Sequence, residues 1–156
     1  GGGQERSLRS GTENVAGIAG FGAAVEAAVR DLPNYMALAK HRDAMEARLK
    51  AEGDVVVIGV ESPRLAGTSN FARAGFRAET QVMALDLAGV CVSAGSACSS
   101  GKVKRSLVLM AMGASDALAE SAIRTSFGWN SEPADFDGVA NAWLEAARRT
   151  VLKEKV

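Results

Sequence analysis

The chain has 156 residues, 47% of them hydrophobic, which is enough for one compact domain or slightly more. Eighteen basic residues balance eighteen acidic ones, and no basic cluster is interleaved with aromatic residues, so an electrostatic surface for nucleic acid is excluded. No charge-free apolar stretch is long enough to cross a membrane, and two cysteines do not make a disulfide framework, so we expect a cytoplasmic protein.

Two helices are predicted in the first third of the chain. Apolar residues recur at helical spacing from Val15 to Val29, after a Gly-rich polar segment. Pro33 is expected to interrupt this helix, and a second helix rich in charged residues follows and ends near Gly53. The opening Gly1–Arg6 has neither the apolar core nor the cleavage site of a signal peptide, so we expect the chain to begin within a longer protein.

The remainder alternates short strands with helices. Apolar or alternating runs predict strands at Val55–Ile58, Thr68–Ala72, Val90–Val92 and Ala122–Phe127. Helical patterns are found at Glu79–Leu87, at Ser106–Met112 and from Pro133 through Leu152. This order predicts an α+β fold with a small, mostly antiparallel sheet packed with helices.

The two cysteines have different surroundings. Cys98 lies in Ser93–Gly101, a run made almost wholly of Gly, Ala and Ser, which provides backbone freedom and little surface to pack. Such a segment can present a thiol to a reactant, so we interpret Cys98 as a nucleophile. Cys91 lies in the apolar run Gly89–Val92 and is expected to be a packed core residue.

A metal site is not expected. His41 is the only histidine, and its charged neighbours indicate an exposed helix face. Neither cysteine stands at metal-ligand spacing from it.

Two further residues are candidates for binding anions. Thr12, with Ser10 and two nearby arginines, precedes a predicted helix, where free N–H groups favour a phosphate; the alternative is a solvated loop in which Thr12 or Ser10 caps the helix. Arg124 lies in a predicted strand between apolar residues, and its planar guanidinium suits a carboxylate; the alternative is a structural salt bridge.

Four segments resemble the cysteine desulfurases of the NifS/IscS type, which belong to the class V aminotransferase branch of the pyridoxal-phosphate enzymes. They occur in the family's order and cover the chain almost end to end: Gly1–Arg6, Arg9–Asn14, Val92–Val103 and Ala122–Trp129. The resemblance implies the C-terminal portion of such an enzyme. Residues 1–33 would be the end of the large cofactor domain, and residues 34–156 the small α+β domain of a fold-type I enzyme, carrying the cysteine loop.

The resemblance also implies roles for individual residues. Cys98 matches the nucleophile that takes sulfur from L-cysteine as a persulfide, leaving L-alanine. Arg124 matches the arginine that holds the substrate carboxylate. Thr12 matches the threonine that reaches the phosphate of pyridoxal 5'-phosphate in the partner subunit, which implies a homodimer. A sulfur acceptor such as an iron–sulfur scaffold protein would be the next partner, serving iron–sulfur cluster or thio-cofactor assembly.

One part of the family's site is missing. None of the lysines matches the family's Schiff-base lysine, and the histidine that precedes it is absent too. We therefore predict that this chain alone neither binds the cofactor covalently nor releases sulfide from cysteine. Two alternatives stay open: a selenocysteine lyase or other class V aminotransferase, and a non-catalytic sulfur-accepting or protein-binding module.

Overall fold

The computed structural model describes residues 2–95 and 106–153, with side chains described up to residue 150. The chain forms two compact units, Gly1–Pro33 and Asn34–Val156. No helix in the described parts is both long and apolar enough to span a membrane.

The first unit consists of an N-terminal loop and most of helix α1, Val15–Ala37. Asn14 caps this helix, because its Oδ1 accepts a hydrogen bond from the Gly17 N–H at 3.1 Å. The expectation that Thr12 or Ser10 is the cap is therefore wrong. The expected break at Pro33 is also wrong, since the helix continues through it to Ala37. Proline loses one backbone hydrogen bond, but its fixed φ is already helical.

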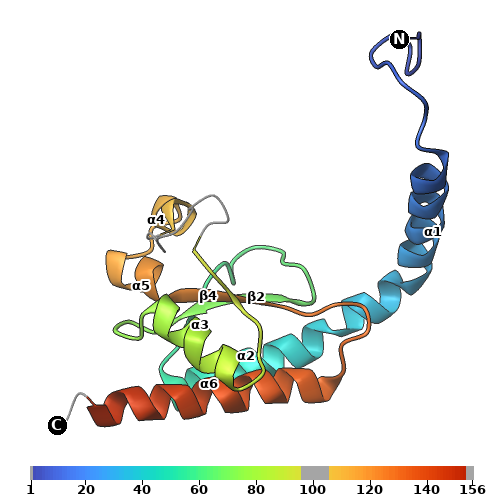
Figure 1. The fold of residues 1–156 in the computed structure, drawn as a ribbon. Coiled ribbons are helices and arrows are strands. Elements are labelled where there is room, and N and C mark those ends of the chain that lie inside the picture. The colour runs from blue at the N-terminus through green and yellow to red at the C-terminus, as the bar shows by residue number, and fades with distance from the viewer. Residues whose placement is uncertain (1, 96–105, 154–156) are drawn as a thin grey trace. The chain divides into compact units, whose positions relative to one another are not determined.

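The second unit contains a four-stranded antiparallel sheet in the order β1-β2-β4-β3, which confirms the α+β prediction. The strands are β1 (Val56–Val57), β2 (Thr68–Ala72), β3 (Ser93–Ala94) and β4 (Ala122–Ser126). The helices are α2 (Ala39–Gly53), α3 (Ala78–Leu87), α4 (Leu107–Ala111), α5 (Asp116–Ser121) and α6 (Pro133–Lys153). Helices α2, α3 and α6 cover one face of the sheet, and α4 and α5 lie on the other (Figure 1).

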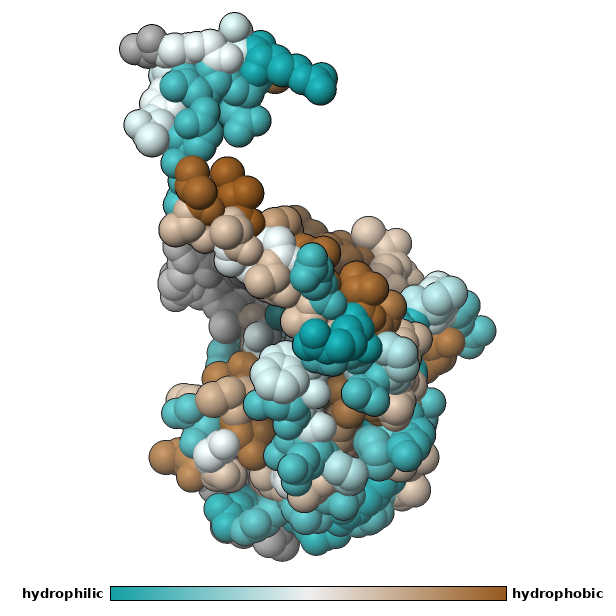
Figure 2. Space-filling view, turned by 90° about the vertical axis from the view of Figure 1, so that its right-hand side faces the viewer, coloured by the Kyte–Doolittle hydropathy of each residue, from teal (hydrophilic) through white to brown (hydrophobic). Residues whose placement is uncertain are grey.

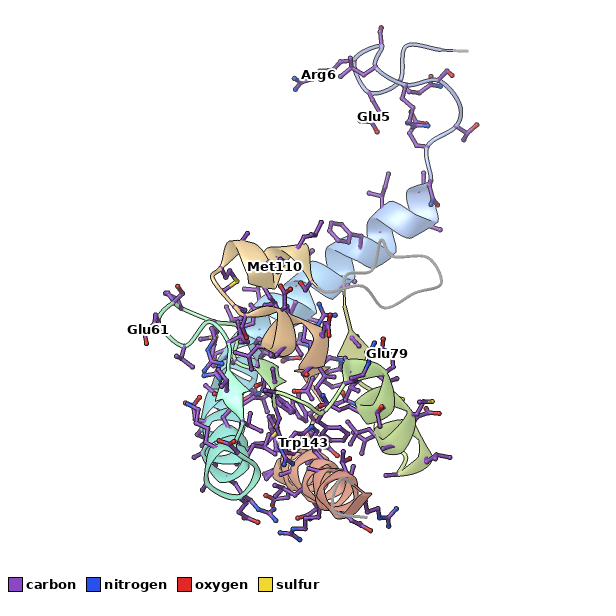
Figure 3. All side chains as sticks on the ribbon, turned by 90° about the vertical axis from the view of Figure 1, so that its left-hand side faces the viewer. Glu5, Arg6, Glu61, Glu79, Met110 and Trp143 are labelled. Atoms are coloured by element: carbon purple, nitrogen blue, oxygen red, sulfur yellow. The ribbon has the colours of Figure 1, made fainter. Side chains whose placement is uncertain are left out.

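The main core lies between the sheet and α2, α3 and α6. Trp143 of α6 is fully buried and points toward the sheet, where its ring meets Phe71 edge-on with centroids 5.8 Å apart (Figure 3). The buried Gln81 joins three segments: its Oε1 accepts from the indole N–H of Trp143 at 2.7 Å, and its Nε2 donates to the carbonyls of Phe76 and Ser121. These bonds satisfy a polar group that is costly to bury alone.

A buried ion pair fixes α2 to the loop before β2. Glu46 is 4% exposed, and both guanidinium nitrogens of Arg64 donate to its carboxylate, at 2.7 and 2.9 Å. The hydrogen bond with Glu46 raises the pKa of Arg64.

The predicted strand at Val90–Val92 is displaced along the chain, because β3 begins at Ser93. Helix α3 ends in a Schellman motif, in which the N–H of Val90 bonds the Leu85 carbonyl at 2.8 Å and Gly89 has φ +77°. Val90 therefore belongs to the helix cap. Cys91, in the connection that follows, is exposed, so the prediction that it is a core residue is wrong.

Two other expectations differ from the structure. Helix α5 was not expected; Ser115 caps it, since its hydroxyl accepts from the Leu118 N–H at 3.4 Å. His41 was expected on an exposed face but is half-buried, with its ring 5.8 Å from that of Phe136 on α6. The charged neighbours of His41 gave no sign of this long-range packing.

Candidate functional site

A cavity of about 300 Å³ opens on the sheet face that carries α4 and α5. Side chains or backbone from β2, β4, β3 and the start of α4 line it. The lining residues are Asn70, Ser93, Ala94, Gly95, Ser106, Leu109, Ala122 and Arg124.

Strand register places three polar residues in one row across this cavity. Arg124 on β4 is paired with Asn70 on β2 and with Ser93 on β3. Adjacent residues of a strand point to opposite faces, so the neighbours Phe71 and Ile123 lie in the core while the polar row faces the cavity. The sheet thus places Asn70 beside Arg124, although the two are more than fifty positions apart in the sequence.

The guanidinium of Arg124 is exposed and makes no hydrogen bond or ion pair within the described part of the chain. The structural salt bridge considered for this residue is therefore not found there. The described lining contains no Asp or Glu, so nothing in it neutralises the arginine. A planar guanidinium at a small cavity that has no acidic lining residue can bind a small carboxylate through two parallel hydrogen bonds.

Cys98 lies within residues 96–105, outside the described residues. Gly95 and Ser106, the described residues on either side of that segment, both line the Arg124 cavity. Ser106 also caps α4, since its hydroxyl accepts from the Leu109 N–H at 3.4 Å. The two described residues that flank the segment with Cys98 in the sequence therefore both lie at this cavity.

Thr12 lies in the first unit and is exposed. Asn14 caps α1 instead, and Nη1 of Arg9 donates to the carbonyls of Ser10, Gly11 and Thr12 at 3.2 to 3.3 Å. The hydroxyl of Thr12 takes part in none of these bonds. Arg124 belongs to the other unit.

The described residues do not fit covalent attachment of pyridoxal phosphate. Lys40 and Lys50, the lysines with described side chains, both lie on α2, and neither lines the Arg124 cavity. Within the described ranges, no group of three His, Cys, Asp or Glu side chains is placed to hold a metal ion.

Sequence reasoning missed Asn70. The residue stands at the centre of the predicted strand Thr68–Ala72, where period-two alternation puts it on the face opposite Phe71. That alternation identifies the polar face of the strand but not which residue on a neighbouring strand lies opposite Asn70. Only the pairing of β2 with β4 shows that Asn70 is opposite Arg124.

Residues 2–139 match the sequence model of the family described as Aminotransferase class-V. The chain is 40% identical to the IscS-like cysteine desulfurase of Mycobacterium tuberculosis, over 97% of this chain and 40% of the relative. It is 39% identical to a cysteine desulfurase of Bradyrhizobium diazoefficiens, over 99% of this chain and 41% of the relative. The chain thus spans about two fifths of the length of these relatives.

The fold is shared with a NifS-like protein from Rickettsia africae, solved by X-ray crystallography. The TM-score is 0.80 at 33% sequence identity, and the match covers 94% of this chain and 38% of that one.

Proposed function

On the premise that the chain belongs to the class V aminotransferase family, a family of pyridoxal-phosphate enzymes, we propose that it is the C-terminal part of a cysteine desulfurase. The complete enzyme converts L-cysteine to L-alanine and passes the sulfur on for iron–sulfur cluster or thio-cofactor assembly. Residues 1–33 belong to its large cofactor domain and residues 34–156 form its small domain.

The observation that carries this proposal is the acid-free cavity around Arg124. The arginine binds the substrate carboxylate through two parallel N–H donors, which orients the rest of the amino acid. A structural arginine would have an acidic partner, and Arg124 has none within the described residues.

Cys98 is the proposed nucleophile. Its thiolate attacks the substrate sulfur, so that an S–S bond forms on Cys98 as the C–S bond of cysteine breaks; the electron pair goes to the substrate carbon, which takes up a proton to give alanine. When bound, pyridoxal phosphate supplies the electron sink for this cleavage. The persulfide then carries the sulfur to an acceptor protein such as an iron–sulfur scaffold.

Thr12 is the proposed contact to the cofactor phosphate across a homodimer. Its exposed hydroxyl is not used as the α1 cap, so it is available to donate. Covalent attachment of the cofactor is not assigned to this chain, and the chain alone is expected to show neither a visible absorbance band from bound cofactor nor sulfide release. We further propose a cytoplasmic location.

The test replaces the matching segment of the Mycobacterium tuberculosis relative with this chain and incubates the chimera with L-cysteine. We expect alanine in solution and one added sulfur on the peptide that contains Cys98, measured by mass spectrometry. Cys98→Ser should abolish both, whereas Cys91→Ser, a matched change seven residues away, should abolish neither.

The same experiment separates the alternatives. A selenocysteine lyase would keep its activity on selenocysteine after Cys98→Ser, and an aminotransferase would not need the thiol. A non-catalytic module would give no alanine in any chimera that binds cofactor.

A further inference from the structure

Asn70 has a polar atom that the fold leaves unsatisfied. Its Oδ1 is buried and accepts no hydrogen bond from residues 2–95 or 106–150, although buried polar atoms nearly always have a partner. The cost of such an atom is large enough that it needs an explanation.

The donor that could satisfy it is on the next strand. Asn70 and Arg124 are direct cross-strand partners, on the same face, and both line the same cavity. Side chains in such positions are close enough to interact. The Arg124 guanidinium has five N–H donors, and none of them reaches an acceptor among the described residues. The Oδ1 of Asn70 is an acceptor that receives no N–H from a described residue.

The Asn70 acceptor is an uncharged amide oxygen, and this affects whether Arg124 can still bind a carboxylate. An Asp or Glu beside Arg124 would form an ion pair and compete with any incoming carboxylate. An amide oxygen accepts one N–H and leaves the positive charge available. Ser93, the register partner on the other side of Arg124, is also neutral.

We propose that Asn70 is a positioning residue: its amide oxygen accepts a hydrogen bond from the Arg124 guanidinium and orients it toward the carboxylate of the amino-acid substrate without neutralising it. This inference rests on the proposed function, because it concerns the same carboxylate site. Hydrogen bonds of this kind are often long without ligand and tighten when the ligand binds.

The experiment titrates the complete 156-residue chain with L-alanine and follows the Arg124 Nε–Hε signal by NMR. L-Alaninamide, which lacks the carboxylate, is the ligand control. Asn70→Ala should weaken L-alanine binding about three- to tenfold, the usual net worth of one hydrogen bond. Asn70→Ser, which keeps a neutral acceptor, should bind within about threefold of the parent.

Asn70→Asp is the decisive variant, since it keeps the size and the acceptor but adds a charge. We expect the new carboxylate to form an ion pair with Arg124 and so to weaken L-alanine binding more than tenfold, which is a larger effect than that of Asn70→Ala. Thr68→Asp is the matched control, because Thr68 pairs with Ser126 one step along the same face and does not line the cavity. It should change the affinity by less than about threefold.

If Asn70 acts through Arg124, the effects of substituting the two residues on L-alanine affinity should not add. In an Arg124→Ala background, Asn70→Ala should cause no further loss of affinity. Equal losses in both backgrounds, or parent-like binding by Asn70→Asp, would overturn the inference while leaving the carboxylate role of Arg124 intact. If the parent chain binds L-alanine no better than L-alaninamide, the Arg124 site itself fails and the inference fails with it.

Discussion

Helices α1 and α6 have similar lengths, 23 and 21 residues, yet they contribute to the structure in opposite ways. No residue of α1 is buried, and seven of its apolar side chains are at least 43% exposed: Val15, Ile18, Phe21, Val25, Val29, Leu32 and Met36. Figure 2 shows such apolar residues on the surface next to the hydrophilic N-terminal segment. Six apolar side chains of helix α6 are 7% exposed or less: Phe136, Val139, Ala140, Trp143, Leu144 and Ala147.

The difference shows that an apolar stripe determines which face of a helix can be buried but does not supply the partner. Helix α6 packs against α2 and α3 under the sheet. On α1, Tyr35 near the C-terminal end is partly buried and packs against the core, while the apolar residues named above are exposed. We therefore expect the free energy of unfolding to depend strongly on α6 and weakly on α1.

The largest expected effect is that of Trp143→Ala on α6. The change removes the centre of the core and leaves Gln81 Oε1 without its donor, so the free energy of unfolding should fall by about 3 to 5 kcal/mol. Urea denaturation measures it. Trp129→Ala is the control, because that side chain is 78% exposed and its loss should cost less than about 1 kcal/mol.

The next effect concerns the link between α3 and α6. Gln81→Ala removes three hydrogen bonds at a fully buried position, and we expect a loss of about 2 to 4 kcal/mol. The neighbouring Thr80 is exposed, so Thr80→Ala should stay within about 0.5 kcal/mol. Equal losses at the two positions in chemical denaturation would contradict the importance of this link.

A matched pair of substitutions tests the comparison directly. Phe136→Gln on α6 should cost about 3 to 5 kcal/mol, whereas Phe21→Gln on α1 should cost less than about 0.5 kcal/mol, since Phe21 is 72% exposed and glutamine is a good helix former. Phe21→Gln should also reduce self-association in sedimentation velocity, because it interrupts the exposed stripe. A large loss of stability at Phe21 would show that α1 has a packing partner.

The smallest effect is expected at the start of α3. Glu79 stands in the first turn, and its pKa is lowered, first by a hydrogen bond to its own backbone N–H and then by Arg77. A carboxyl whose folded pKa lies below its unfolded value of about 4.5 stabilises the fold above that pH and loses this contribution as the pH falls through the folded pKa. Glu79→Gln should therefore cost a few tenths of a kcal/mol at pH 7 and nothing at about pH 2, measured by thermal unfolding at both pH values.

Local patterns predicted most elements well. The strand at Thr68–Ala72 has the predicted limits, and the helices at Glu79–Leu87 and from Pro133 are found with small shifts, because alternation, caps and helical spacing act over a few residues. The errors at Pro33 and Cys91 arose from local rules that their surroundings override. Pro33 is tolerated inside α1, and the helix cap after α3 moves the strand beyond Cys91.

The candidate site was partly predictable. Arg124 was found from its own chemistry, as a guanidinium in a strand that also carries the apolar Ile123 and Phe127. Asn70 was missed because an isolated polar residue in a strand has no signal that names its neighbour across the sheet. Cys98 was predicted as a nucleophile from its small neighbours, and Thr12 as an anion contact from its place before a helix. The resemblance made these roles specific, and both stay predictions.

By itself, the sequence determined the periodicities, the α+β class and the family, since these depend on residue types at short spacing. Only the tertiary structure decided that Asn70, Arg124 and Ser93 form one row, and that α6 rather than α1 is buried. The physical reason is that strand register and helix burial depend on contacts between segments far apart in the chain, where a shift of one residue would turn every side chain of a strand to the other face.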